Sequence, residues 1–385
     1  MLEQSHARSL LALLAERRLL DVDVPPDLEA ERKRLDAAVD QAMEDVAGSR
    51  AGSGRAAAEA RLLDARDQQK ALAARIRAQA PGTAAFRYPE PLGAEQIAAR
   101  LDPGTLLIAY SVGTRQALAF ALTAPGDGAP FALRAAVLPA DAAVLRRRAL
   151  DWRRRVEAAT PDPAIARESR ALYDLLLRPF APELARARRL VVVPDGPLHG
   201  LPFAALHDGR RFVAAAIPSS VAPSGTLATR WIEGRRSAGW NPPILFGDPG
   251  GDRAGHLPGS RVEARDIARR FPGAVVHMGA EASEDNAKTL PRGARFVHFA
   301  VHGMIDTSSP LDSGLALREG RKAGATPENG LLQAWEIVER VRLDTDLVTL
   351  SACRSADGPE RAGEGTMGLV RAFQYAGARS VLASL

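Results

Sequence analysis

The stretches FVHFAVHG (residues 296–303) and LVTLSACR (residues 347–354) decide the fold. Each is an apolar run of strand length, rich in β-branched residues, that stops at a base or nucleophile and continues into a turn or polar segment. Such runs are typical of buried parallel strands, which deliver a side chain to the edge of a sheet. The first run ends on the imidazole of His302, and the second ends on Cys353, the only thiol in the chain.

The spacing of these two residues indicates a catalytic pair. A Cys with a His about 50 residues upstream is the arrangement of caspase-type cysteine peptidases, and His302 precedes Cys353 by 51 positions. The local sequence shares Ala-Cys-Arg with the caspase pattern, whereas Ser351 and Ser355 replace its Gln and Gly. A lone Cys is more often a small buried hydrophobe. Because both residues end strands, we favour the catalytic interpretation.

His298 competes with His302 for the role of base. Side chains alternate along a strand, so His298 and His302 should share one face, but only His302 reaches the loop that opens to solvent. Gly303 follows, and its lack of a side chain leaves room for a substrate carbonyl. We therefore predict that His298 is a core histidine. His302 and Cys353 should lie at the carboxyl ends of adjacent parallel strands, with their side chains in one cleft.

The composition is that of an ordinary soluble globular protein. The chain has 385 residues, 46% hydrophobic and 25% charged, which predicts two or three structural units. No run approaches the roughly 18 apolar residues of a membrane span, and we find no signal peptide. One Cys forms neither an internal disulfide nor a Cys-based zinc site, which fits a reducing cytoplasm. We expect a cytoplasmic protein with no membrane association, no metal and no cofactor.

The net charge of +5 rests almost wholly on arginine. Two arginine triplets, residues 146–148 and 153–155, flank Trp152 on one predicted helix. Basic residues beside an aromatic side chain can bind nucleic acid. However, these arginines point around much of the helix and alternate with Leu145 and Leu150, so we favour a solvated helix face over a nucleic-acid site.

The remaining pattern predicts a helical hairpin followed by an α/β domain. Residues 1–80 read as helix, with breaks at Pro25-Pro26 and at residues 52–54, and the last two helices form an antiparallel hairpin that we interpret as a spacer. Short strands separated by turn residues suggest an antiparallel meander over residues 106–138. From Leu190 onward, strands and helices alternate, which indicates a mainly parallel sheet with helices on both faces.

Two local signals complete the pattern. Ser260 and Glu263 form a predicted capping box for a helix that ends at Phe271, and Ser283 is a predicted N-cap. The loop FGDPGGD (residues 246–252) follows a strand, as phosphate cradles do, but it lacks their glycine order and their Gly-Lys-Ser/Thr, and it carries two carboxylates. We favour a flexible turn.

Several motifs, in order, resemble those of the CHAT family. They are VVPDGPLHGLPFAAL (192–206), APS (222–224), HFAVHG (298–303), LSAC (350–353) and the segment from GEG to AGA (363–378). CHAT proteins are caspase- and separase-like cysteine peptidases, commonly encoded behind tetratricopeptide repeats in bacteria. The resemblance covers about residues 90–385. It implies an α/β fold, namely a caspase-like three-layer sandwich with a mainly parallel sheet, preceded by an N-terminal helical hairpin.

The resemblance also implies an activity and a site. It maps the nucleophile of a Cys-His dyad onto Cys353 and the base onto His302, and so implies a cysteine endopeptidase that cleaves protein substrates. The natural oxyanion donors are the backbone N–H groups of Gly303 and Cys353. The candidates for substrate binding are Asp306, Asp312 and Ser351, although the two aspartates fit a solvated loop better.

The expected organisation is a hairpin over residues 1–88 and a CHAT peptidase domain over residues 89–385. The family pattern continues beyond Leu385, so we expect a C-terminally truncated domain with an uncovered apolar edge strand. The partners expected are a protein substrate and a regulatory protein. Two other functions stay open, namely a catalytically silent CHAT scaffold that binds a partner, and a nucleotide- or nucleic-acid-binding α/β protein.

Overall fold

The structure, a computed structural model, describes most of the chain. The described residues are 25–48, 53–79, 92–125, 131–157, 163–233, 241–250, 255–306, 310–319, 329–351 and 362–383. The chain divides into two compact units, one formed by Leu11–Glu90 and the other by Met1–Leu10 together with Pro91–Leu385. The helix predicted over residues 10–20 and the thiol of Cys353 lie outside the described residues.

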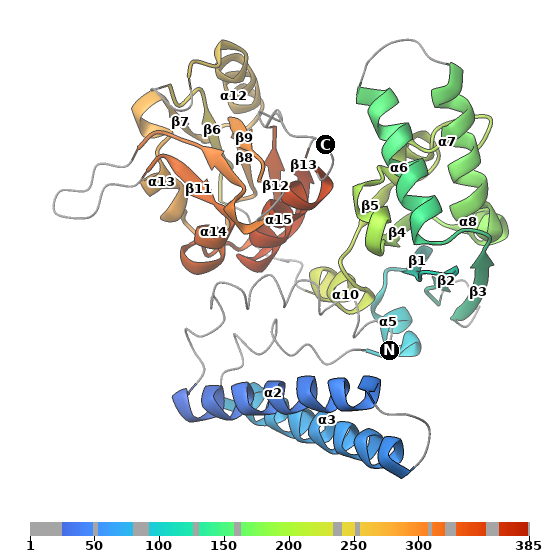
Figure 1. The fold of residues 1–385 in the computed structure, drawn as a ribbon. Helices are drawn as coiled ribbons and strands as arrows, with labels where there is room; N and C mark the ends of the chain where they lie inside the picture. The colour runs from blue at the N-terminus through green and yellow to red at the C-terminus, as the bar shows by residue number, and fades with distance from the viewer. Residues whose placement is uncertain are drawn as a thin grey trace. The chain divides into compact units, whose positions relative to one another are not determined.

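The smaller unit contains the predicted helical hairpin, α2 (Pro26–Gly48) and α3 (Ser53–Gln79), which lie side by side in Figure 1. Among the described side chains, Leu28 and Leu35 of α2 pack with Leu72 and Ile76 of α3. Exposed ion pairs from Arg75 to Glu31 and from Arg61 to Asp45 also link the helices. The Arg75–Glu31 pair joins the start of α2 to the end of α3, and the Arg61–Asp45 pair joins the end of α2 to the start of α3, so the helices are antiparallel.

The first sheet of the larger unit has the order β3-β2-β1-β4-β5. Its strands are β1 (Thr105–Val112), β2 (Ala117–Thr123), β3 (Ala132–Leu138), β4 (Arg189–Val193) and β5 (Ser219–Val221). The first three form the antiparallel meander that the sequence predicted, whereas β4 and β5 continue parallel to β1. The assignment of the Leu190 strand to the later parallel sheet was therefore wrong. β1 is buried along its first six residues and takes β4 as the partner on its second edge.

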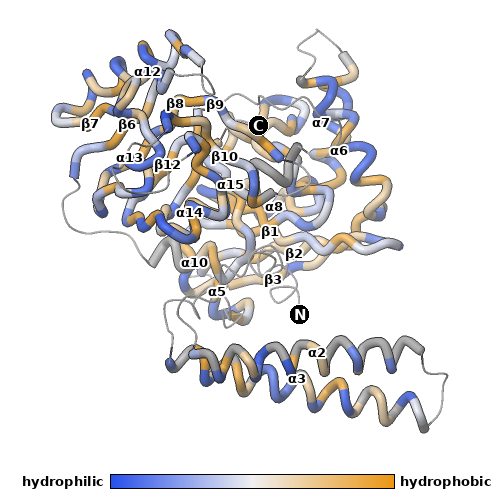
Figure 2. The backbone as a smooth tube through the Cα atoms, turned by 60° about the vertical axis from the view of Figure 1, so that its left-hand side comes forward, coloured by the Kyte–Doolittle hydropathy of each residue, from blue (hydrophilic) through white to orange (hydrophobic). Residues whose placement is uncertain are grey.

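Helices cover both faces of this sheet. They are α5 (Ala94–Arg100), α6 (Ala142–Glu157), α7 (Pro163–Leu176), α8 (Ala181–Arg186), α9 (Val213–Ala216) and α10 (Gly225–Glu233). Side chains of β1 alternate between the two layers. Tyr110 packs with Trp152 of α6, whereas Leu107 packs with Ile97 of α5 and Ala228 of α10. The sheet therefore has a hydrophobic core on each of its faces, and its central strands are largely hydrophobic (Figure 2).

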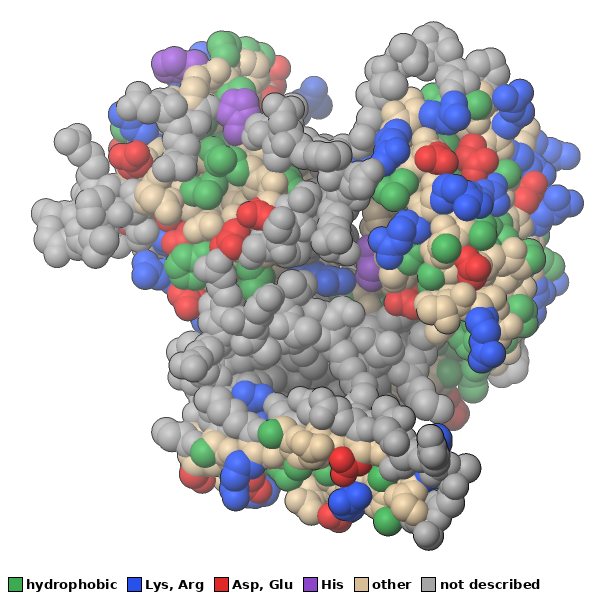
Figure 3. All heavy atoms as spheres, viewed as in Figure 1, with side chains coloured by type: hydrophobic (Ala, Val, Ile, Leu, Met, Phe, Trp, Pro, Cys, Tyr) green, Lys and Arg blue, Asp and Glu red, His purple; other side chains and the backbone are tan. Residues whose placement is uncertain are grey.

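The arginine-rich helix α6 buries its apolar face and exposes most of its arginines. Leu145 and Trp152 point into the core, while Arg146 and Arg147 are exposed. Basic side chains gather over α6 and α7 in Figure 3, interspersed with acidic ones. Arg148, for example, donates from Nε to Glu168 Oε1 of α7 at 2.6 Å.

The second sheet is entirely parallel, with the order β13-β12-β8-β6-β7. Its strands are β6 (Ile244–Gly247), β7 (Val275–Met278), β8 (Phe296–Ala300), β12 (Thr345–Leu350) and β13 (Ala378–Ala383). His298 of β8 faces Glu263 of α12 (Pro258–Arg270). The next residue, Phe299, faces Phe373 of α15 (Ala362–Tyr375). Helices therefore lie on both faces, which confirms the predicted mainly parallel α/β sandwich.

A small antiparallel sheet with the order β11-β10-β9 adjoins the chain after β8. Its strands are β9 (His302–Met304), β10 (Gly314–Ala316) and β11 (Leu331–Gln333), and two short helices lie beside it, α13 (Glu284–Lys288) and α14 (Ala334–Arg340). Gly314 is required by the close packing of this sheet. A Cβ there would lie 2.9 Å from Leu331 Cδ1.

The predicted N-cap at Ser283 is confirmed, because its hydroxyl accepts from Asn286 N. The predicted capping box at Ser260 is wrong. Helix α12 begins at Pro258, a residue pre-organised for the first helical turn. Ser260 therefore lies inside the helix, where its hydroxyl donates to Leu257 O and accepts from Asp248 N.

The loop after β6 is held by its own carboxylate. Asp248 is buried, accepts from Leu257 N at 2.7 Å and pairs with Arg261. Burial raises the pKa of Asp248, but the Leu257 N–H and the Arg261 guanidinium outweigh it and hold the pKa below its usual value. A phosphate at the α12 N-terminus would meet this carboxylate. Asp248 therefore anchors the described start of this loop, while residues 251–254 lie outside the described residues and the flexible turn stays a prediction.

Helices in the described part of the chain are all too short or too polar to cross a membrane.

Candidate active site

His302 is the first residue of β9, just beyond the parallel sheet. Strand β8 ends at Ala300, the chain bends at Val301, and His302 then pairs with Ala316 of β10. The run over residues 296–303 was predicted as one strand, but it contributes to two sheets. The imidazole of His302 is half-buried, so it lies at a boundary between the core and the surface.

His298 is buried, as predicted, and only 4% of its surface is exposed. Its Nε2 lies 3.2 Å from Glu263 Oε1, yet the two atoms are not aligned for a hydrogen bond, and Nε2 has no other hydrogen-bond partner among the described residues. Burial lowers the pKa of His298, and the Glu263 carboxylate only partly opposes this effect. The imidazole is therefore neutral at pH 7 and belongs to the core between β8 and α12.

The segment that leads to Cys353 runs directly beside β8. Leu350 of β12 is in register with Phe299 of β8, and Ser351 N donates to Phe299 O at 2.9 Å. Ser351 is exposed, and the described chain stops there, two residues before Cys353. The thiol and the backbone N–H of Cys353 lie outside the described residues.

The other candidate residues lie on and after β9. Gly303 is buried and is in register with Leu315 of β10. Asp306 is exposed, and its backbone N–H donates to the hydroxyl of Ser313 at 3.0 Å. Asp312 is half-buried, and its carbonyl accepts from Gln333 Nε2 at 3.1 Å. The hairpin that follows His302 is thus tied at both ends by side chains from the small sheet and its connections.

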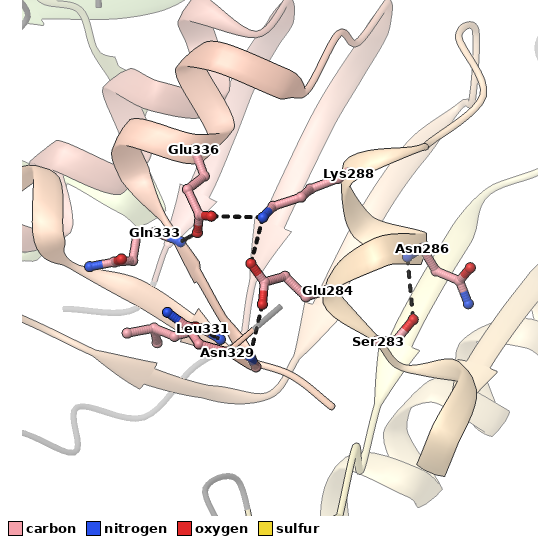
Figure 4. Close-up of polar contacts among 9 residues, drawn as sticks. Ser283, Glu284, Asn286, Lys288, Asn329, Leu331, Gln333 and Glu336 are labelled. Carbon is pink, nitrogen blue, oxygen red and sulfur yellow. Dashed lines mark hydrogen bonds and ion pairs between the residues drawn. The ribbon is translucent and has the colours of Figure 1, made fainter. Parts of the chain in front are cut away.

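Sequence reasoning missed a buried charged cluster beside the small sheet (Figure 4). Lys288 Nζ lies 2.6 Å from Glu284 Oε1 and 2.7 Å from Glu336 Oε1. Glu284 is fully buried, and the other two residues are nearly so. Burial, reinforced by the charge of Glu336, raises the pKa of Glu284 to about 7 although Lys288 opposes the rise. The only sequence signal is an i,i+4 Glu-Lys pair, which ordinarily indicates an exposed helix face.

Comparisons with known proteins agree with the fold and with the motifs. The model of the CHAT domain family matches residues 166–385. The chain is also similar to Tetratricopeptide repeat protein 28 from Homo sapiens, with 26% identity over 274 residues that cover 56% of this chain and 11% of that protein. It thus spans about a tenth of the length of that relative. Because the family match extends over more than half of the sequence and includes both candidate catalytic positions, the chain belongs to the CHAT domain family.

Proposed function

We propose that this protein is a cysteine endopeptidase in which Cys353 is the nucleophile and His302 the base. The register between β8 and β12 supports this proposal most directly. Phe299 and Leu350 lie side by side on adjacent parallel strands, and the two catalytic candidates follow them by three residues each. The segments that follow β8 and β12 therefore leave the sheet side by side at the carboxyl ends of its strands, which is where ligands of parallel sheets bind.

Chain geometry makes an encounter of the two side chains feasible. Adjacent strands lie about 4.8 Å apart, and three extended residues reach at most roughly 11 Å. A Cys-His dyad needs its reacting atoms within about 3 Å of each other, with looser geometry in a free enzyme. His302 is half-buried whereas His298 is buried and neutral, which supports His302 as the residue that meets both the thiol and the substrate.

The chemistry is amide hydrolysis through a thioester. The Cys353 thiolate, whose reference pKa near 8.5 is lowered by an imidazolium, attacks the scissile carbonyl. As the C–N bond breaks, His302 transfers its proton to the leaving amine. Water, deprotonated by His302, then cleaves the thioester and restores the thiol. The N–H groups of Gly303 and Cys353 are the proposed oxyanion donors, a role typically worth about 10²- to 10³-fold in rate.

The substrate of the proposed reaction is a protein, and no cofactor takes part. Ser351 stands where the caspase pattern has Gln, which argues against strict cleavage after Asp. Asp306 and Asp312 are candidates for recognising a basic side chain near the scissile bond. We also propose that residues 1–88 form the spacer hairpin and residues 89–385 the peptidase domain. The division of the chain between Glu90 and Pro91 supports this boundary, whereas Met1–Leu10 is grouped with the larger unit.

A regulatory protein partner is the remaining part of the proposal. The similarity to a protein named for tetratricopeptide repeats supports it. Such a partner would control when the dyad meets its substrate.

The test is a proteome-wide search for new protein N-termini. Cell extract is incubated with the wild-type chain, with Cys353→Ala, or with His256→Ala, which changes an exposed histidine far in sequence from the dyad. We expect a shared set of new N-termini with the wild type and His256→Ala and none with Cys353→Ala. Identical sets from the wild type and Cys353→Ala would favour the catalytically silent scaffold.

A further inference from the structure

We propose that the buried cluster of Glu284, Lys288 and Glu336 positions His302 by clamping β11 at both of its ends. The inference rests on the proposed role of His302 as the catalytic base, and it assigns the three residues a positioning role, with no contact to substrate. Three observations support it: the hydrogen bonds of the cluster, the register of the small sheet and the burial of three ionisable side chains.

The clamp consists of the carboxylate oxygens that do not face the lysine. Glu284 Oε2 accepts from Gly330 N at 2.8 Å, immediately before β11, and Glu336 Oε2 accepts from Gln333 N at 2.9 Å, at the last residue of β11. Lys288 Nζ bridges the two remaining oxygens at 2.6 and 2.7 Å. Figure 4 shows the two carboxylates and the lysine arranged around this short strand. Both ends of β11 are therefore fixed to one ammonium group.

Strand pairing connects β11, through β10, to His302 of β9. Leu331 pairs with Ala316, and Ala316 pairs with His302 on its other side. These three residues form one row, and Gly330, held by Glu284, immediately precedes that row in the chain. Leu317 N also donates to Gly330 O at 2.8 Å. A displacement of Gly330 would therefore shift the row that sets the backbone position of His302.

Helix α13 is attached to the same row through its backbone. Glu284 N donates to Arg318 O, and Arg318 N donates to Ala282 O. Gly330 has a φ of +78°, and a Cβ there would lie 3.0 Å from Leu317 O, so the chain makes a close approach at the point where Glu284 holds it. Backbone hydrogen bonds to Arg318 and the buried carboxylate of Glu284 on Gly330 thus fix this part of the small sheet relative to α13.

The burial of the cluster indicates that its role is conformational rather than one of bulk stability. Buried ion pairs contribute little compared with apolar side chains of similar volume, whereas in some proteins they specify one arrangement of the elements they join. Apolar replacements would also leave the N–H groups of Gly330 and Gln333 without acceptors. Each of the two carboxylates accepts a hydrogen bond from one end of β11, which apolar side chains of the same volume could not do.

The experiment compares Lys288→Met with Lys288→Arg and with Arg379→Met in the full chain. Lys288→Met removes the bridge but keeps most of the side-chain volume, and Lys288→Arg restores a cation. Arg379→Met is the matched control, because Arg379 is a mostly buried cation that bonds Asp344 and Asp346 outside the small sheet. Three quantities are measured: the NMR titration of the His302 imidazole, hydrogen exchange at the Gly330 and Gln333 amides, and alkylation of Cys353 by iodoacetamide at pH 6.

For Lys288→Met we expect the NMR titration of His302 to change and the amides of Gly330 and Gln333 to exchange at least tenfold faster than in Arg379→Met. The alkylation rate of Cys353 should fall roughly tenfold, because small displacements in a catalytic pair are costly. Lys288→Arg should recover part of each. If Lys288→Met does not fold, Glu284→Gln serves instead, because it keeps an acceptor for Gly330 but replaces the carboxyl group that pairs with Lys288. A folded Lys288→Met or Glu284→Gln in which the His302 titration and both amides match Arg379→Met would overturn the proposal.

The outcomes separate this inference from the proposed function. If Cys353 is alkylated at the same rate in His302→Ala as in the wild type, His302 and Cys353 do not form a catalytic dyad. The titration and exchange measurements would still show whether the cluster positions the His302 row, because neither requires catalysis.

Discussion

Replacing Glu284 with Gln should remove a pH-dependent part of the protein's stability. The pKa of Glu284 is raised from 4.5 to about 7 in the folded chain, first by burial and then by the charge of Glu336. Between these two pH values the folded chain holds a proton that the unfolded chain has lost. The stability contributed by this proton is therefore fully present below about pH 4.5, declines as the pH rises, and is lost above about pH 7.

The magnitude follows from the size of the shift. Each pKa unit corresponds to about 1.4 kcal/mol, so the free energy of unfolding contributed by Glu284 should fall by roughly 3 kcal/mol from pH 4.5 to pH 7. The assay is urea unfolding of the wild type and Glu284→Gln at half-unit intervals from pH 5 to pH 8. Titrating groups that do not interact with Glu284 cancel in the difference between the two proteins, whereas Lys288 and Glu336 belong to the same cluster and are tested together with it. A difference that stays constant over this range would refute the reasoning about the buried carboxyl.

Three further changes test the described structure, each by urea unfolding at pH 7. Lys288→Met should destabilise by about 3 to 5 kcal/mol because it removes the cation that the buried Glu284 and Glu336 share, and a loss under about 1 kcal/mol would show that the cluster is not effectively buried. Asp248→Ala should cost about 1 to 3 kcal/mol because Arg261 and the first turn of α12 lose their acceptor, whereas an unchanged midpoint would contradict this. Gly377→Ala should cost about 3 kcal/mol or more, since its φ of +111° and the nearby Leu343 carbonyl exclude a side chain. A neutral effect would mean that this turn can relax.

Much of the fold could be predicted from local pattern. Apolar runs of strand length that alternate with capped helices predicted the parallel sheet, and the turn residues between residues 106 and 138 predicted the meander. These features depend on residues close in sequence, which is why they were accessible. The partners of a fully buried strand are not local. The β4 strand reads the same whether it pairs with β1 or with β8, and only the three-dimensional arrangement places it beside β1.

In the candidate site, too, local features could be predicted and non-local contacts could not. His298 could be assigned to the core from its place within an apolar run, and the structure confirms its burial. The bend at Val301 could not be foreseen, because the apolar pattern continues unbroken through it. The cluster around Lys288 was missed since an i,i+4 Glu-Lys pair usually faces solvent, and its burial depends on Glu336, 48 residues away. The start of α12, by contrast, could have been found from Pro258.

The most direct test of the dyad is the pKa of the Cys353 thiol, read from the pH dependence of its alkylation by iodoacetamide. The wild type is compared with His302→Ala, and His256→Ala serves as the control. If His302 activates the thiol, the midpoint for the wild type and for His256→Ala will lie well below the reference value near 8.5, and that for His302→Ala will rise to about that value. The same midpoint in the wild type and His302→Ala would contradict the claim that these two residues act as a catalytic pair.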